Sequence, residues 1–284
     1  SAPGARLTAA ALGVDGSAGP SSNGNRVLEA GETVTVVPSW FNGYSVPQTF
    51  TGTATDFAGP GAPGNPFYTI ADGTASYATV ANGGTGICTA TSDCYAVGIS
   101  VPSTRPGTHW DAHFDEEIAP LALAATKTWA LHVGDSFPDV PRSSGFYSFV
   151  ETLLHHDVTG GCTTTAYCPA ASTSRAQMAV FVLVAKEGSG YAPPPCGTPM
   201  FADVPASSPF CRWIEELARR GVVGGCGAGL YCPSSPVSRE EMAVFVLLTR
   251  DPGVFPPACG TPMFSDVPSS SPFCRWIEEL VRRG

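Results

Sequence analysis

An internal repeat constrains the architecture of this chain more than any other feature of its sequence. The motif Phe-x-Asp-Val-Pro recurs with a period of 64 and then 63 residues, starting at Phe137, Phe201 and Phe264. Residues 196–221 also match residues 259–284 at 23 of 26 positions. A fixed period of this kind is typical of tandem supersecondary units. We therefore predict three repeats, at residues 135–198, 199–261 and 262–284, the third of them truncated.

Each repeat is predicted to be a helical hairpin. In the second repeat, apolar residues recur at helical spacing over residues 210–217, and Gly221 can end that helix. A second helix is expected to begin at each of two capping-box patterns, Ser174-Arg-Ala-Gln177 and Ser238-Arg-Glu-Glu241. The apolar run that follows the second pattern, residues 242–248, favours a buried helix.

Residues 1–134 have a different character. Thr, Val, Ser, Ala and Gly form short alternating runs, for example at residues 32–37, 48–55, 95–101 and 127–133. The Gly-Pro, Asn-Gly and Asp-Gly steps between such runs favour turns. Several short strands with this spacing predict a β-sandwich. The expected fold class is therefore multidomain, with an N-terminal all-β sandwich (Ig-like) at residues 1–134 followed by all-α helical-hairpin repeats.

Charge and hydropathy argue against two classes of partner. The formal net charge is −9 and lysine occurs only at Lys127 and Lys186, so nucleic acid is not expected to bind. The longest apolar runs are about eight residues, far below the roughly 20 that span a bilayer, so no membrane span is expected. The chain begins Ser-Ala-Pro-Gly without a methionine, which we expect of a mature secreted protein after removal of its leader.

The ten cysteines predict a disulfide framework, and hence an oxidising, extracellular compartment. Three Cys-x5-Cys spacings predict the bonds Cys88–Cys94, Cys162–Cys168 and Cys226–Cys232. The other four cysteines predict Cys196–Cys211 and Cys259–Cys274. One repeat period earlier, His132 and Tyr147 stand at the positions equivalent to Cys196 and Cys211, so both partners of a bond are absent together. Zinc is disfavoured, because its cysteine ligands are typically separated by only two to four residues.

Several motifs follow one another in a fixed order along the repeats. They are Phe-x-Asp-Val-Pro, Ile-Glu-x-Leu, Gly-Val-x-Gly, Tyr-Cys-Pro and Ser-Arg before Met-Ala-Val-Phe. This order resembles that of bacterial S-layer homology (SLH) repeats, over about residues 137–284. The resemblance implies helical hairpins in tandem that hold exported proteins to cell-wall polysaccharide.

The resemblance also implies a set of glycan-binding residues. In SLH repeats the acid of the first motif and the arginine before the second helix help to build pockets between repeats for the glycan. The matching residues here are Asp139, Asp203, Asp266, Arg175 and Arg239. Carboxylates and guanidinium groups make directional, charge-assisted hydrogen bonds that suit sugars. The alternative is a structural role, because an Asp beside a helix start often caps the helix or pairs with that arginine.

Oxygen-bearing side chains cluster in the segment Ser22-Asn-Gly-Asn-Arg-Val-Leu-Glu-Ala-Gly-Glu32. Calcium prefers several such oxygen ligands. The segment resembles calcium-binding loops of exported bacterial Ig-like domains, which would make the ligands Asp15, Asn23, Asn25, Glu29 and Glu32. The alternative is a polar turn that leads into a strand at Thr33. No organic cofactor is expected.

No catalytic signature is present: the sequence has no Gly-x-Ser-x-Gly, P-loop or His-Glu-x-x-His motif, so an enzyme is not expected.

Residues 109–117 contain histidines and acids, but their alternation predicts a half-buried strand with Trp110, Ala112 and Phe114 on one face, rather than a metal site. The Glu-Glu pairs that begin at residues 116, 215, 240 and 278 are interpreted as solvated. His155 is expected only to complement a helix dipole.

Together these patterns predict a non-catalytic structural protein, secreted to the extracellular space or cell surface of a bacterium. It would act in cell-surface assembly or attachment, with cell-wall glycan or copies of itself as partners. Two alternatives stay open. The chain could be the subunit of a self-polymerising extracellular filament in which residues 2–14 add as a strand to a neighbour, or the targeting portion of a larger secreted enzyme.

Overall fold

The chain forms two compact units in a computed structural model that describes residues 6–14, 21–61 and 63–284. The sandwich unit comprises Ser1–His155 and Gly160–Tyr167, and the helical unit comprises His156–Thr159 and Cys168–Gly284. The first helix of the first predicted repeat therefore belongs to the sandwich unit. The repeat boundaries at residues 135, 199 and 262 rest on sequence periodicity and stay a prediction.

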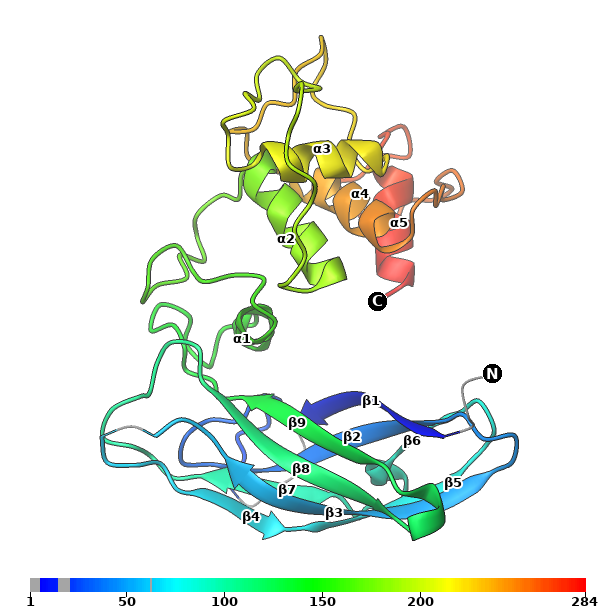
Figure 1. Ribbon diagram of the computed structural model, residues 1–284. Coiled ribbons are helices and arrows are strands. Elements are labelled where there is room, and N and C mark those ends of the chain that lie inside the picture. The colour runs from blue at the N-terminus through cyan, green and yellow to red at the C-terminus, as the bar shows by residue number, and fades with distance from the viewer. Residues whose placement is uncertain (1–5, 15–20, 62) are drawn as a thin grey trace. The chain divides into compact units, whose positions relative to one another are not determined.

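Two antiparallel sheets make up the sandwich (Figure 1). One sheet has the order β1-β2-β7-β4, with β6 also paired to β2; these strands are β1 (Leu7–Val14), β2 (Thr33–Asn42), β7 (Tyr95–Ile99), β4 (Tyr68–Asp72) and β6 (Thr85–Ile87). The other has the order β5-β3-β8-β9, made of β5 (Thr74–Val80), β3 (Gln48–Ala58), β8 (Asp111–Ala119) and β9 (Thr126–His132). The prediction of an N-terminal β-sandwich is confirmed.

The strand expected to be donated to a neighbour lies at the edge of the first sheet. Residues 7–14 form β1, which pairs antiparallel with β2 of the same chain. Residues 1–5 lie outside the described part. Strand addition in a filament would therefore require β1 to leave its own sheet.

Alternating side chains of both sheets fill one apolar core. Its largest fully buried members are aromatic: Trp40, Phe50, Tyr77, Tyr95, Trp110 and Phe114. On β8, Trp110, Ala112 and Phe114 are buried while His113 is exposed, so the alternation predicted for this segment is confirmed. Burial of such large rings is the main source of stability for a sandwich of this size.

One carboxylate lies in the middle of this core, and its predicted solvation is wrong. Glu116 on β8 is 0 % exposed and accepts four hydrogen bonds. The donors are the indole Nε1 atoms of Trp40 (3.0 Å) and Trp129 (2.6 Å) and the hydroxyls of Tyr77 (2.6 Å) and Tyr95 (2.8 Å). Four donors replace the water that the buried carboxylate loses.

The Glu116 network also fixes a neighbouring backbone position. Gly52 on β3 lies so close that a Cβ atom there would collide with the Tyr95 hydroxyl and stand 2.7 Å from Glu116 Oε1. Strand β3 can therefore approach the network only with glycine at this position.

Five α-helices follow the strands in the part of the chain that the structure describes. They are α1 (Tyr147–His155), α2 (Arg175–Glu187), α3 (Cys211–Arg219), α4 (Arg239–Arg250) and α5 (Cys274–Arg282). Both predicted capping boxes form: Ser174 with Gln177 begins α2, and Ser238 with Glu241 begins α4. Each box satisfies two amide groups at the helix start, which explains why these helices begin where they do.

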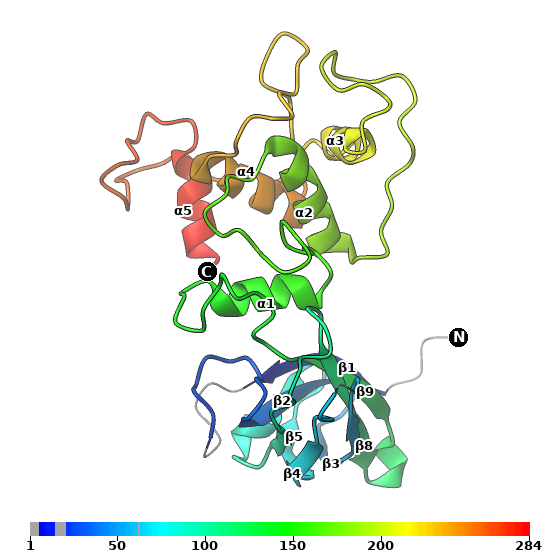
Figure 2. The same ribbon diagram turned by 90° about the vertical axis from the view of Figure 1, so that its left-hand side faces the viewer.

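The helices bury two separate apolar clusters. Side chains of α2, α3 and α4 form the core of the helical unit, with Leu183, Ile214, Leu217 and Tyr231 fully buried. Helix α1 instead packs with Val27, Phe137 and Val140 in the sandwich unit. Figure 2 shows α1 beside the strands of that unit. No helix in the described residues has the length and apolar character that a bilayer crossing requires.

Disulfides close loops in both units. Cys88 is bonded to Cys94, Cys196 to Cys211, Cys226 to Cys232 and Cys259 to Cys274, as the sequence predicts. Cys162 and Cys168 are also in disulfide form. No cysteine of the described residues is a free thiol.

Candidate functional site

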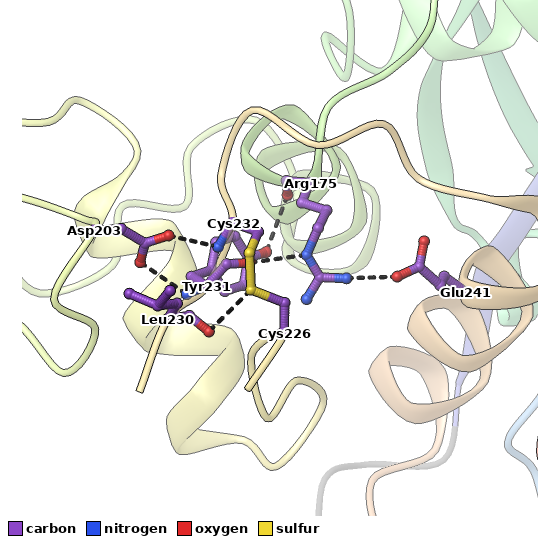
Figure 3. The surroundings of a disulfide bond; sticks show 7 residues. All are labelled: Arg175, Asp203, Cys226, Leu230, Tyr231, Cys232 and Glu241. Carbon is purple, nitrogen blue, oxygen red and sulfur yellow. Dashed lines mark hydrogen bonds and ion pairs between the residues drawn. A yellow bond between two sulfur atoms is a disulfide. The ribbon is translucent and has the colours of Figure 1, made fainter. Parts of the chain in front are cut away.

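The acid of the Phe-x-Asp-Val-Pro motif binds the backbone of a turn about 28 residues later. The Asp203 carboxylate accepts hydrogen bonds from the amides of Tyr231 (2.8 Å) and Cys232 (2.7 Å), as Figure 3 shows. In the first repeat Asp139 Oδ1 accepts one from the amide of Tyr167 at 3.0 Å. Burial would raise the pKa of Asp203, but the two backbone hydrogen bonds lower it below its usual value.

The phenylalanine of the Phe-x-Asp-Val-Pro motif contacts the tyrosine of the Tyr-Cys-Pro motif. The Phe201 ring lies 5.4 Å from the Tyr231 ring, and Phe137 lies 5.6 Å from Tyr167. Gly225, with a φ of +86°, comes so close to the Leu230 carbonyl that a Cβ atom would collide with it. The motifs that define the repeat in sequence are therefore in contact in space, in both repeats.

Arg175 joins the start of α2 to the turn of the following repeat (Figure 3). Its Nε donates to the Tyr231 carbonyl at 3.0 Å and its Nη1 to Glu241 Oε1 at 2.8 Å. The guanidinium also lies over the Tyr231 ring, 4.9 Å from the centroid, and the residue is only 7 % exposed. Burial raises the pKa of Tyr231 to about 12, and its hydroxyl donates to the Arg175 carbonyl at 3.0 Å.

The five residues predicted to bind glycan thus fall into two groups. Asp203 and Arg175 are engaged in internal contacts, and Asp139 holds the equivalent turn in the first repeat. Arg239 and Asp266 are exposed, and no hydrogen bond or ion pair within the described residues involves their side chains. Asp139 belongs to the sandwich unit, and the other four residues belong to the helical unit.

A second repeated acid was missed in the sequence. Glu151, Glu215 and Glu278 each accept a hydrogen bond, at 3.0 Å, from the backbone amide 15 residues earlier: Ser136, Met200 and Met263 respectively. Glu151 and Glu215 are buried, so the predicted solvation of residue 215 is wrong. The sequence could have indicated these acids, because they recur with the same period as the Phe-x-Asp-Val-Pro motif.

The predicted calcium ligands lie together, apart from Asp15, which is outside the described residues. The Glu29 carboxylate accepts hydrogen bonds from the side-chain amides of Asn23 (2.7 Å) and Asn25 (2.6 Å). The Glu32 carboxylate accepts hydrogen bonds from the backbone amides of Asn23 (3.1 Å) and Glu29 (3.3 Å). Glu29 is 0 % exposed and Glu32 is 6 % exposed.

Two neighbouring buried carboxylates are unfavourable unless a proton or cation compensates them. Burial, and then the proximity of Glu29, raise the pKa of Glu32 to about 7. Arg142 is near, with its Nη1 at 3.7 Å from Glu29 Oε2, but it is bonded chiefly to Asp135. The paired carboxylates and amides provide the oxygen-rich donor set that a hard divalent cation prefers, so these residues fit calcium.

Comparison with known proteins identifies one part of the chain. Residues 201–243 match the family model of the S-layer homology (SLH) domain. The match includes Asp203, the Tyr231 turn and the capping box of α4. No curated protein matches the chain.

Among solved structures, the chain is similar to the ASH / PapD-like domain of human CEP192 (PapD-like domain 7). The sequence identity is 12 %, the match covers 38 % of this chain and 75 % of that chain, and the TM-score is 0.21. At that score the similarity supports no inference about this chain.

Proposed function

We propose that this chain is a non-catalytic bacterial surface protein that attaches to cell-wall glycan through SLH repeats. The observation that carries the proposal is the SLH match at residues 201–243. An SLH domain is a cell-surface attachment module, which supports an exported, extracellular location. The disulfides support the same location, because such bonds persist in oxidising compartments.

The proposal extends the matched segment to a tandem array. The Asp139–Tyr167 and Asp203–Tyr231 hydrogen bonds are equivalent, as are the Phe137–Tyr167 and Phe201–Tyr231 ring contacts. These shared contacts support repeats at residues 135–198 and 199–261, with a truncated repeat at 262–284. In this proposal the sandwich is an Ig-like domain that the repeats hold at the surface.

Within this proposal the five candidate glycan residues have different tasks. Arg175 and Asp203 shape the repeat by holding the Tyr231 turn, and Asp139 does so in the first repeat. Arg239 and Asp266 have exposed side chains that can meet a sugar directly. A guanidinium and a carboxylate together can bind hydroxyl and charged groups of a polysaccharide.

Removal of the exposed pair should weaken wall binding without affecting the fold. We expect the purified protein to cosediment with bacterial cell walls that retain their polysaccharide, and not with walls stripped of it. The double variant Arg239→Ala, Asp266→Asn should bind about tenfold or more weakly, since each lost charged contact is worth about 1.5–3 kcal/mol before solvent screening.

The matched control is Arg250→Ala, which removes an exposed arginine from the other end of α4. It should bind as the unmodified protein does. Equal sedimentation with intact and stripped walls would contradict the proposal, and equal losses in Arg239→Ala and Arg250→Ala would show that only general charge is involved.

We further propose that calcium binds the loop of Asn23, Asn25, Glu29 and Glu32, with Asp15 as a further candidate ligand. A bound ion would neutralise the two buried carboxylates and fix the loop that precedes β2. With an affinity typical of extracellular calcium modules, about 5 mM calcium would stabilise the sandwich by about 1.4 kcal/mol. This corresponds to a rise in Tm of roughly 3–6 °C relative to the protein in chelator.

The calcium proposal is tested by measuring, for each variant, the Tm with calcium minus the Tm in chelator. Because each variant is compared with itself, any effect of the substitution on the metal-free protein cancels. Glu29→Gln should abolish the rise, whereas Glu117→Gln, at an exposed position on β8, should keep it. An unmodified protein whose Tm is insensitive to calcium would favour the polar-turn interpretation instead.

A further inference from the structure

Three histidines and an aspartate from distant parts of the chain meet on the sandwich unit. The ligand atoms of His109, Asp111, His132 and His155 all lie within 4.8 Å of one another. The local alternation around Asp111 is that of an ordinary strand. Two of the three histidines come from elsewhere, so the group forms only in the folded chain.

Strand register and helix position bring these residues together. Asp111 on β8 and His132 on β9 are directly opposed in the antiparallel pair. His109 precedes Asp111 by two residues and therefore shares its face. His155 is the last residue of α1, a helix of the same unit (Figure 2).

The Asp111 carboxylate is the centre of the group. Its Oδ1 lies 2.8 Å from His132 Nδ1, and its Oδ2 lies 3.1 Å from both His109 Nε2 and His155 Nδ1. In a tetrahedral site with metal–nitrogen bonds of about 2.0–2.1 Å, the ligand atoms stand about 3.3 Å apart. Small side-chain rotations would therefore suffice to place one ion among the four.

A second carboxylate orients the most buried histidine. His132 Nε2, on the side of the ring away from Asp111, lies 2.7 Å from Glu151 Oε2. Glu151 is itself held by the amide (3.0 Å) and hydroxyl (2.6 Å) of Ser136. Metal-binding histidines commonly donate their second ring N–H to such a carboxylate, which fixes the tautomer and the ring direction.

We propose that His109, Asp111, His132 and His155 bind one divalent transition-metal ion of the zinc class. Imidazole nitrogens select such ions over calcium or magnesium, which prefer all-oxygen ligands. Four protein ligands fill a tetrahedral shell, so the site is structural rather than catalytic. The side chains of His109, Asp111 and His155 are 34 %, 31 % and 23 % exposed, which lets an ion enter from solvent.

The site would fasten α1 to the β8–β9 pair. The bond between Cys196 and Cys211 ties the start of α3 to the segment before it. One repeat period earlier, the equivalent positions are His132 and Tyr147, which form no such bond. A metal held partly by His132 would give α1 a different link, from the end of the helix to the sheet.

Zinc titration of the chelator-treated, untagged, unreduced protein by calorimetry tests this site. We expect one ion per chain, and cobalt(II) as a substitute should give the intense visible absorption of tetrahedral coordination. Asp111→Asn and His155→Ala should lower zinc affinity by about 100-fold or more, and Glu151→Gln by about 10–100-fold. His109→Ala, at the most exposed ligand, is a second variant in case the others perturb folding.

His113→Ala is the matched control, because His113 lies on β8 with its side chain exposed and outside the group. It should bind zinc and cobalt as the unmodified protein does. The proposal is wrong if zinc binding is not saturable, if it persists in both Asp111→Asn and His109→Ala, or if His113→Ala abolishes it. An ion-pair network without metal would give the first of these results.

Discussion

Replacement of Glu116 by alanine should lower the free energy of unfolding of the sandwich unit by roughly 3–5 kcal/mol. The reason is the set of donors left behind. Two indole N–H groups and two tyrosine hydroxyls point at this carboxylate from buried side chains, and none can reach water without opening the core. Each unsatisfied buried donor costs about 1–3 kcal/mol, partly offset by relaxation.

Glu116→Gln should cost less, roughly 1–3 kcal/mol, since the amide oxygen can still accept from two donors. Urea unfolding followed by tryptophan fluorescence measures both effects, because Trp40 and Trp129 contact Glu116 directly. Glu117→Ala, one residue further along β8 and exposed, is the control and should stay within about 0.5 kcal/mol of the unmodified protein. Equal unfolding midpoints for Glu116→Ala and Glu117→Ala would contradict a structural role for the buried carboxylate.

Arg175→Ala should destabilise the helical unit by roughly 2–4 kcal/mol. Loss of one partner from a fully buried ion pair costs about 3–5 kcal/mol. The expected cost of Arg175→Ala is lower, because the Glu241 side chain is 29 % exposed and water can solvate its carboxylate. The variant also leaves the Tyr231 carbonyl without its donor and removes the cation above the Tyr231 ring. Arg175→Lys should recover only part of the loss, because an ammonium group cannot reproduce the planar fork.

The chain supplies a matched control for this prediction. Arg239 follows a capping serine just as Arg175 does, but it is exposed. Arg239→Ala should leave the Tm of the helical unit unchanged within about 2 °C, while the Tm of Arg175→Ala falls by several degrees. Equal changes in Tm would mean that the buried contacts of Arg175 contribute nothing beyond its place at the helix start.

The elements that sequence predicts well here are those decided by local chemistry. The capping boxes at Ser174 and Ser238 need only residues within one turn, and both form as predicted. Alternation along β8 likewise placed Trp110, Ala112 and Phe114 inside the sandwich. The Cys196–Cys211 bond was predictable because an internal repeat revealed which cysteines are present or absent together.

The sequence was misleading where a charged side chain is buried by distant partners. Glu116 follows the same alternation as Phe114, so its inward position was available from the strand period, but its four donors come from β2, β5, β7 and β9. The partners of Arg175 are likewise 56 and 66 residues away. The histidine group depends on strand register and on where α1 ends, and neither follows from local composition.

The disulfides have a mechanical consequence for a protein under tension. A chain segment can be stretched by at most about 3.3–3.6 Å per residue. The Cys196–Cys211 and Cys259–Cys274 bonds each close a loop of 15 residues. Even after the chain has unfolded, each loop cannot extend, which shortens the stretched chain by about 50 Å per bond. The Cys88–Cys94 and Cys226–Cys232 bonds close loops of 6 residues and shorten the stretched chain by about 20 Å each. Pulled from its ends, the oxidised chain is therefore a shorter tether than its length in residues implies, and reduction would lengthen it in discrete steps.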